Sequence, residues 1–110
     1  MIQGRVKRFA KIAGEMISLT TVEQELDRLW PDMHHAVVAV ADERKGEKLV
    51  LITEHQEANI KEVRTYLRDR GFSDLYVPRE LLVVDKVPVL GTGKTDYPTC
   101  QEKANEKFAD

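Results

Sequence analysis

The stretch His35-Ala36-Val37-Val38-Ala39-Val40-Ala41 decides the fold, because it is a continuous apolar run bounded by polar segments. A run of this kind is typical of a β-strand that is covered on both faces. The polar, glycine-containing residues 42–47 connect it to a second strand-like run at 48–53, which predicts an antiparallel pair. A third apolar run at 81–84 predicts the last strand of a small sheet.

Two amphipathic segments between these strands and before them predict helices. Residues 20–30 place apolar side chains at i, i+4, i+7 and i+8, and Thr20 to Glu23 fits a capping box. Residues 59–70 repeat apolar positions on one face, behind Asn59 as a suitable N-cap. We expect both helices to pack their apolar faces on the sheet.

The two ends of the chain complete the predicted architecture. Residues 5–19 predict a β-hairpin, because Gly14 can adopt the unusual backbone angle that its tight turn needs. Residues 97–108 predict a short terminal helix with Pro98 in its first turn. The chain is therefore predicted to be an α+β domain with an N-terminal β-hairpin and a three-stranded, mainly antiparallel sheet flanked by helices.

Length and composition restrict the class of protein. The 110 residues suffice for one domain, and the formal net charge of −2 gives no indication of nucleic acid or of an anionic membrane as a partner. Cys100 is the single cysteine, which excludes an internal disulfide and fits a reducing compartment. No apolar run approaches the roughly 18 residues of a membrane span. These features predict a soluble cytoplasmic domain.

The segment Pro88-Val89-Leu90-Gly91-Thr92-Gly93-Lys94 combines two glycines with one lysine after the last predicted strand. Gly91 and Gly93 predict a flexible loop that carries Lys94 at its tip. A phosphate-binding P-loop does not fit, because Pro88 stands where that motif needs glycine and Pro98 disfavours the long helix that must follow. Two interpretations stay open, a solvated surface turn and a lysine that acts in the site of another domain.

Other candidate groups are sparse. His34 and His35 are adjacent, so on a strand they would point to opposite faces and could not chelate one metal ion; ordinary surface or half-buried histidines are favoured. The cations of the hairpin either form a solvated face or contact phosphate or an acidic partner; they are Arg5, Lys7, Arg8 and Lys11. No nucleophile–base pair, paired carboxylates or metal cluster is apparent. The sequence resembles one part of an active site.

Two motifs together resemble the C-terminal domain of the adenylate-forming enzymes, which include acyl-CoA synthetases, peptide-synthetase adenylation domains and luciferases. Residues 4–15, Gly-Arg-Val-Lys-Arg-Phe-Ala-Lys-Ile-Ala-Gly-Glu, followed by Glu23, are similar to the hinge and hairpin motif of the family. Residues 87–94, Val-Pro-Val-Leu-Gly-Thr-Gly-Lys, are similar to its final lysine motif. Residues 75–79 and 88–97 look most like the acyl–acyl-carrier-protein synthetase branch, whose members also act as 2-acylglycerophosphoethanolamine acyltransferases.

The resemblance implies a role for each matching residue. Lys94 would contact the carboxylate and nucleotide during adenylation, and Gly14 would line the tunnel for the pantetheine thiol. The remaining implied roles are nucleotide binding by Arg5, a hinge at Lys7, and contact with phosphopantetheine phosphate or a carrier protein by Lys7, Arg8 and Lys11. Many relatives carry an arginine two residues after the hairpin glycine, where this chain has Met16, so phosphate contacts would come from elsewhere.

The same resemblance implies a larger enzyme. This chain would be its mobile C-terminal lid, with ATP, Mg²⁺ and the fatty acid bound mainly by an N-terminal large domain, and with acyl carrier protein or coenzyme A as acceptor. The parent enzyme would be associated with the bacterial inner membrane. The implied divisions of the single domain 1–110 are a hinge near 5–8, a hairpin at 5–19, a body at 20–87, a lysine loop at 88–97 and a terminal helix at 97–108. The alternative is a stand-alone α+β module that binds an acidic protein through its basic hairpin.

Overall fold

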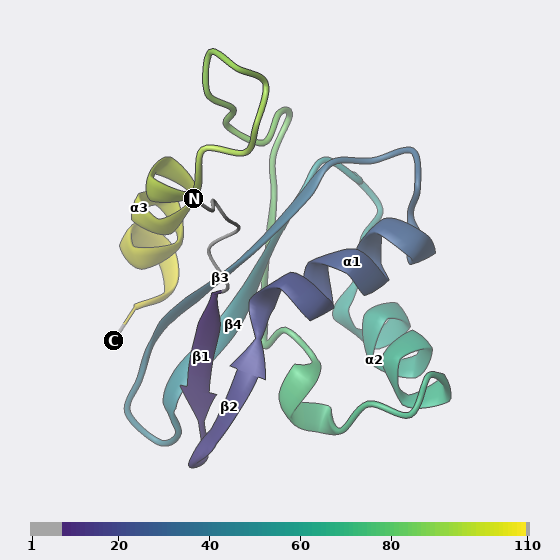
Figure 1. The fold of residues 1–110 in the computed structure, drawn as a ribbon, viewed down its shortest axis with the longest axis vertical. Helices are drawn as coiled ribbons and strands as arrows, with labels where there is room; N and C mark the ends of the chain where they lie inside the picture. The colour runs from purple at the N-terminus through teal and green to yellow at the C-terminus, as the bar shows by residue number, and fades with distance from the viewer. Residues whose placement is uncertain (1–7, 110) are drawn as a thin grey trace, which may run out of the picture.

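The computed structural model describes residues 8–109 and shows a small α+β architecture (Figure 1). Arg5 and Lys7, with the hinge predicted around them, lie outside the described residues. The elements follow one another as β1 (Phe9–Ile12), β2 (Glu15–Ser18), α1 (Leu19–Leu29), β3 (His35–Asp42), β4 (Gly46–Thr53), α2 (Ile60–Asp69), the 3₁₀ turn η1 (Asp74–Tyr76), β5 (Glu80–Val83) and α3 (Tyr97–Phe108).

The three-stranded sheet has the order β3-β4-β5. β3 and β4 are antiparallel over their whole length, from the pair His35 and Thr53 to the pair Asp42 and Gly46. β5 then pairs with β4 in parallel, because the chain crosses over through α2 before it returns to the sheet. This arrangement confirms the predicted hairpin and mainly antiparallel sheet flanked by helices.

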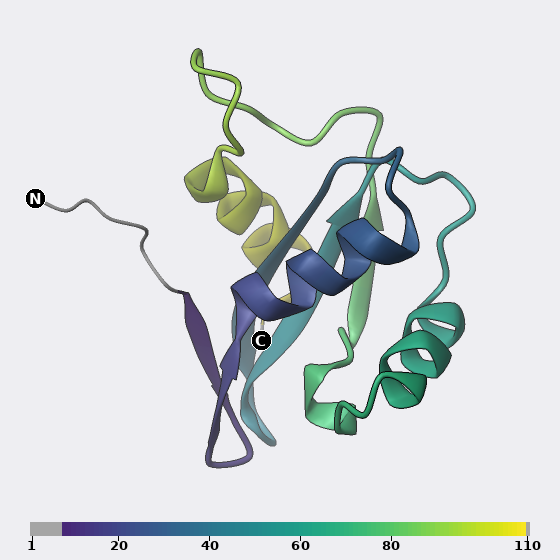
Figure 2. The ribbon, with the colours of Figure 1, turned by 45° about the vertical axis from the view of Figure 1, so that its right-hand side comes forward.

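Both faces of the sheet are covered, as the apolar run at residues 35–41 predicted. Successive strand residues point to opposite faces, so Val37 packs with α1, α2 and the hairpin, whereas Val38 packs against α3. Figure 2 shows α3 on one side of the sheet and α1 and α2 on the other. Each fully buried valine or leucine contributes about 1.5–3 kcal/mol to stability. The two cores therefore hold all three layers together.

The first helix begins differently from the prediction. Ser18 is its N-cap, and the Ser18 hydroxyl accepts a hydrogen bond from the backbone N–H of Thr21. The predicted capping box between Thr20 and Glu23 was wrong, because the Glu23 carboxylate turns instead toward partners in other elements. The second helix begins as predicted, with the Asn59 side chain accepting from the N–H of Glu62.

The hairpin formed by β1 and β2 stands beside the sheet and turns at residues 13–14. Gly14 has a φ of 86°, which confirms the predicted need for glycine at this position. The N–H of Ala13 donates to the carbonyl of Lys45, so the turn is attached to the connection between β3 and β4. In the part of the chain from residue 8 to 109, no helix has the length and apolar character that crossing a membrane requires.

Candidate functional site

The segment from residue 88 to 96, here called the Lys94 loop, is a short antiparallel ribbon. Its arms meet at a bridge between Val89 and Thr95. Inside that bridge, the N–H of Leu90 donates to the carbonyl of Lys94 (2.7 Å), and the N–H of Gly93 donates to the carbonyl of Leu90 (2.8 Å). Gly93 has a φ of 89°, so a side chain at this turn position would strain the backbone. The loop thus has a defined hydrogen-bonded shape.

The tip of the Lys94 loop projects from the body of the domain (Figures 1 and 2). Lys94 is exposed, and the neighbouring side chains Val89 and Leu90 are 50% and 46% exposed. The tip therefore exposes one ammonium group and two apolar side chains.

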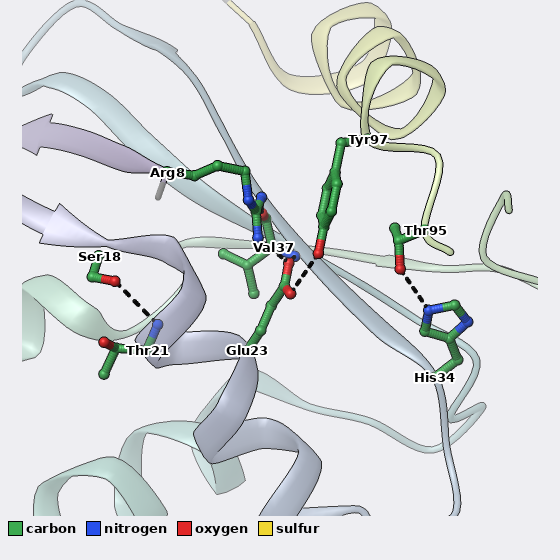
Figure 3. Close-up of polar contacts among 8 residues, drawn as sticks. All are labelled: Arg8, Ser18, Thr21, Glu23, His34, Val37, Thr95 and Tyr97. Carbon is green, nitrogen blue, oxygen red and sulfur yellow. Dashed lines mark hydrogen bonds and ion pairs between the residues drawn. The ribbon is translucent and has the colours of Figure 1, made fainter. Parts of the chain in front are cut away.

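Side chains from elsewhere in the fold anchor both ends of the Lys94 loop. Before the loop, the Glu54 carboxylate accepts a hydrogen bond from the N–H of Val87 (2.8 Å). After Lys94, the Thr95 hydroxyl is hydrogen-bonded to Nε2 of His34 (Figure 3), and the two atoms lie 2.9 Å apart. These contacts attach the loop to the ends of β3 and β4, so the position of its tip is tied to the sheet.

The Glu23 cluster, which consists of Arg8, Glu23, Val37 and Tyr97, lies next to these anchors (Figure 3). Glu23 Oε2 accepts from Arg8 Nη2 (2.6 Å) and from the N–H of Val37 (2.8 Å), and Glu23 Oε1 accepts from the Tyr97 hydroxyl (2.7 Å). The second terminal amine of Arg8 donates to the carbonyl of Val37 (2.7 Å). One carboxylate thus joins the start of the hairpin, β3 and α3 to its own helix.

The aromatic ring of Tyr97 completes the cluster. The Arg8 guanidinium carbon lies 3.8 Å from the centre of this ring, which is a cation–π contact. Burial, together with the hydrogen bond to Glu23, raises the pKa of Tyr97 to about 12. The phenol therefore stays protonated at neutral pH and acts as the donor to Glu23.

Several residues of this site were missed by the sequence interpretation. Glu23 was noted only as a capping and motif residue, Tyr97 only as the last residue of the predicted lysine loop at 88–97, and His34 was not connected with that loop. A separation of 74 positions lies between Glu23 and Tyr97, so no local pattern in the sequence could pair them. The available signal was Glu23 in the hairpin motif, which indicated a requirement for a carboxylate without naming its partners.

The hairpin turn presents a second group of predicted residues. Lys11, Gly14, Lys45, Gly46 and Glu47 line a shallow open depression at this turn. A Cβ atom built on Gly14 would meet nothing within 4 Å, so packing in the described residues leaves space beside this glycine. The lining carries both signs of charge, because it combines Lys11 and Lys45 with Glu47, and the two lysines can pair with a negatively charged group.

The cations predicted on the hairpin have different environments. Lys11 is exposed, and its backbone N–H donates to the Glu47 carboxylate (2.8 Å). Arg8 instead is only 20% exposed at its side chain and has internal partners for both terminal amines. Met16 lies directly opposite Lys11 in the hairpin and is 59% exposed. On this hairpin, the outward face therefore mixes a cation with an apolar side chain.

The two adjacent histidines are separated by the fold. His34 contacts Thr95, whereas His35 is buried between the Thr53 hydroxyl and the carbonyl of Trp30. Burial lowers the pKa of His35, which favours the neutral ring. The expectation of surface or half-buried histidines was thus wrong for His35, because the apolar strand carries it inside. Within residues 8–109, no group of three or more potential metal ligands is brought together.

Cys100 lies on the buried face of α3. Burial raises the pKa of its thiol to about 11, so very little thiolate is present at neutral pH. The thiol packs in the core between α3 and the sheet. Cys100 therefore has a packing role in this fold.

Comparison with known proteins gives relatives along the whole chain, although no family profile matches it. The chain is 30% identical, over 97% of its length, to the mitochondrial medium-chain acyl-CoA ligase ACSF2 of Danio rerio. It is 27% identical, over 87% of its length, to the vibriobactin-specific 2,3-dihydroxybenzoate-AMP ligase of Vibrio cholerae. The chain spans 18% of the length of each of these relatives.

Solved structures support the same relationship. The apo structure of MbtA from Mycobacterium smegmatis matches with a TM-score of 0.80 and 26% identity, over 91% of this chain and 19% of that one. The amide bond synthetase McbA from Marinactinospora thermotolerans matches with a TM-score of 0.74 and 27% identity, over 98% of this chain and 22% of that one. The fold is that of the C-terminal domain of adenylate-forming enzymes.

Proposed function

We propose that this chain is the mobile lid domain of an ATP-dependent, AMP-forming ligase that activates a carboxylic acid and transfers it to a thiol. The observation that carries the proposal is the exposed Lys94 on an anchored loop that projects from the body of the domain (Figure 1). A cation held in this way suits a site whose other half lies on a second domain. The similarity to acyl-CoA and AMP ligases over most of the chain supports the same conclusion.

Lys94 acts in the first half-reaction, in which the substrate carboxylate attacks the α-phosphate of ATP and pyrophosphate leaves. Negative charge is then shared among the carboxylate, the α-phosphate and the departing group, and a positioned ammonium group stabilises that arrangement. Arg5 contacts the nucleotide, and the backbone at Lys7 is the hinge. Mg²⁺ would be held mainly by the large domain, together with the ATP phosphates.

Gly14 acts in the second half-reaction, in which a pantetheine thiol attacks the acyl-adenylate. The hairpin turn and the Lys94 loop lie at opposite ends of the domain in both views (Figures 1 and 2). One end cannot occupy the place of the other unless the domain turns as a whole. We therefore propose that rotation about the hinge exchanges the two ends at a single site.

Lys7 and Lys11 supply the contact with the phosphate of phosphopantetheine or with the acidic surface of its carrier protein. The sequence also suggested Arg8 for this contact, but its two terminal amines have partners inside the domain. For this reason the proposal depends on the two lysines. Of these two, Lys11 belongs to the described residues, and it is exposed. A contact of this kind is sensitive to salt, because exposed charges are screened.

The finer assignment is a fatty acid as substrate and acyl carrier protein as acceptor. It rests on the similarity of residues 75–79 and 88–97 to the acyl–acyl-carrier-protein synthetase branch. In that setting the enzyme serves re-acylation of lysophospholipids, and its cytoplasmic lid works beside the bacterial inner membrane. In this proposal the domain 1–110 is divided as the motifs imply, with a hinge at 5–8 and the lysine loop at 88–97.

The first test replaces Lys94 by alanine in the full-length polypeptide that carries this domain. The rate of adenylate formation, measured as the release of pyrophosphate, should fall by about a hundredfold or more, because the transition state loses a positioned cation. Transfer from preformed acyl-adenylate to the thiol should be retained. Lys86→Ala is the matched control, since Lys86 is an exposed lysine just before the same loop. Similar losses in both half-reactions would contradict the proposed role of Lys94.

The second test replaces Gly14 by leucine, again in the full-length polypeptide. Thiol transfer should fall by about tenfold or more, because a bulky side chain would obstruct the approach of the pantetheine arm. Adenylation should be retained. Gly71→Leu is the matched control, since Gly71 also has a positive φ (93°) and open space around a Cβ, and both variants therefore carry the same kind of backbone strain. Equal effects of the two variants on thiol transfer would contradict the proposal that Gly14 lines the pantetheine tunnel.

A further inference from the structure

Hydrogen bonds link the base of the Lys94 loop to the start of the hairpin, which follows the proposed hinge. Tyr97 comes three residues after Lys94 and begins α3, and its hydroxyl donates to Glu23 (2.7 Å). Glu23 in turn accepts from Arg8 (2.6 Å), which precedes β1 and follows Lys7 directly in the chain. The path from the hinge side of the domain to the lysine side therefore runs through two hydrogen bonds.

The bonds along this path are strong ones. Both involve an ionised carboxylate, and charge-assisted hydrogen bonds are roughly twice as strong as neutral ones. The side chains of Arg8 and Glu23 are only 20% and 14% exposed, so solvent screens their attraction less than it would at the surface. The Arg8 guanidinium also stacks on the Tyr97 ring, so these two residues hold each other directly as well as through Glu23.

We propose that Arg8, Glu23 and Tyr97 are positioning residues, which lock the base of the Lys94 loop to the strand beside the hinge so that Lys94 turns as a rigid extension of the domain. This proposal rests on the function proposed above for Lys94. The other anchors of the loop join it only to the ends of β3 and β4. The Glu23 cluster alone, among the anchors described, reaches the start of the hairpin.

Rigidity of this kind matters because Lys94 must arrive at a site formed on another domain. Displacement of a catalytic group by about 1 Å can lower the rate by about a hundredfold. Among residues 8–109, the exposed tip makes backbone hydrogen bonds only within the loop itself, so its placement depends on the anchors at its base. Among these anchors, Tyr97 can be altered with the least disturbance of the surrounding packing, because substitution by phenylalanine keeps the ring and deletes only the hydroxyl.

The decisive experiment compares Tyr97→Phe with the unchanged full-length polypeptide in the two half-reactions. The kcat of adenylate formation should fall by about tenfold, while KM for ATP changes less and transfer from preformed adenylate to the thiol is retained. Tyr76→Phe is the matched control, because Tyr76 packs on the core of the opposite face of the sheet. Arg8→Lys keeps the charge but loses the planar stacking and should give an intermediate loss of kcat.

Hydrogen exchange measured by mass spectrometry on the same proteins supplies a second readout. Peptides that cover residues 88–96 should exchange faster in Tyr97→Phe than in Tyr76→Phe, because the hydrogen-bonded ribbon opens more often when its base is loosened. Peptides from β3 and β4 should exchange equally in the two variants. Unchanged exchange in the loop would overturn the proposal.

The two proposals fail in different ways. If Lys94→Ala cripples adenylation and Tyr97→Phe leaves it intact, the positioning role is overturned and the function stands. If Tyr97→Phe lowers both half-reactions equally and also lowers the unfolding temperature, the cluster has only a structural role and the proposal is again overturned. If Lys94→Ala leaves adenylation intact, the proposed function fails, and the catalytic part of this inference fails with it.

Discussion

Two glutamates on α1 invite comparison, because each is paired with an arginine although they lie only two residues apart. Glu23 contacts Arg8 of the hairpin, together with β3 and α3. Glu25 accepts two hydrogen bonds from Arg70 at the end of α2 (2.8 and 3.3 Å) and lies 4.0 Å from Arg28 of its own helix. Residues two apart on a helix point in different directions, so one residue type contacts two separate parts of the fold.

The difference between the two pairs is in how their partners are placed. The Glu25 side chain is only 9% exposed, but its partner Arg70 is 43% exposed, so the pair fastens α1 to α2 with its arginine in contact with solvent. The partners of Glu23 lie inside the domain, and one of them, the backbone N–H of Val37, belongs to a fully buried residue of β3. A polar group in that position has no water to replace a lost partner. We therefore expect substitution of Glu23 to destabilise the fold more than substitution of Glu25. The reason is the burial of the partners of Glu23, more than the ion pair itself.

The largest expected effect is the difference in the free energy of unfolding between variants of these two glutamates. Glu23→Ala should lower the free energy of unfolding by about 3 kcal/mol, because it leaves Arg8, the N–H of Val37 and the Tyr97 hydroxyl without their acceptor. Glu25→Ala should cost only about 1 kcal/mol, because Arg70 can turn to water. Urea denaturation of both variants measures the two values, with the slope of the transition checked for constancy.

A matched pair of arginine variants sharpens this comparison. Arg8→Ala and Arg70→Ala, each combined with the corresponding glutamate variant, give two double-mutant cycles. The coupling energy should be the larger one for Arg8 with Glu23. Equal coupling energies would show that the burial of the Glu23 cluster adds nothing, and the contrast between the two glutamates would then be withdrawn.

Much of the architecture could be predicted because its causes are local in the sequence. The apolar run from residue 35 to 41 predicted a doubly covered strand, and the glycine at position 14 predicted a turn with a positive φ. Asn59 was identified as a helix cap for the same reason, since its partner lies three residues away. Periodicity and turn chemistry act over a few residues, so a single sequence is enough to detect them.

The contacts that hold the candidate site could not be predicted in this way. The capping role expected of Glu23 was a local interpretation, and it was wrong because three partners from other elements compete for the same carboxylate. His34 and Glu54 anchor the Lys94 loop only because the ends of β3 and β4 are brought beside it. Such pairs depend on the assembled sheet, and composition around Lys94 showed only two glycines and a cation.

The smallest expected effect concerns the stability contributed by the pair of Glu25 and Arg70, measured as a function of pH. The hydrogen bonds from Arg70 hold the pKa of Glu25 below its ordinary value, with a smaller contribution in the same direction from Arg28. The folded protein therefore favours the ionised carboxylate, and this stabilisation is complete above the ordinary pKa of 4.5 and is lost as the pH falls through the lowered value. Glu25→Gln should be less stable than the unchanged protein at neutral pH, and the difference should shrink as the solution becomes more acidic.

Asp74→Asn serves as a positive control for this pH trend, because Arg68 lowers the pKa of that exposed carboxyl in the same direction. A stability difference for Glu25→Gln that stays constant down to about pH 3 would show that Arg70 contributes through packing and not through the charge of Glu25.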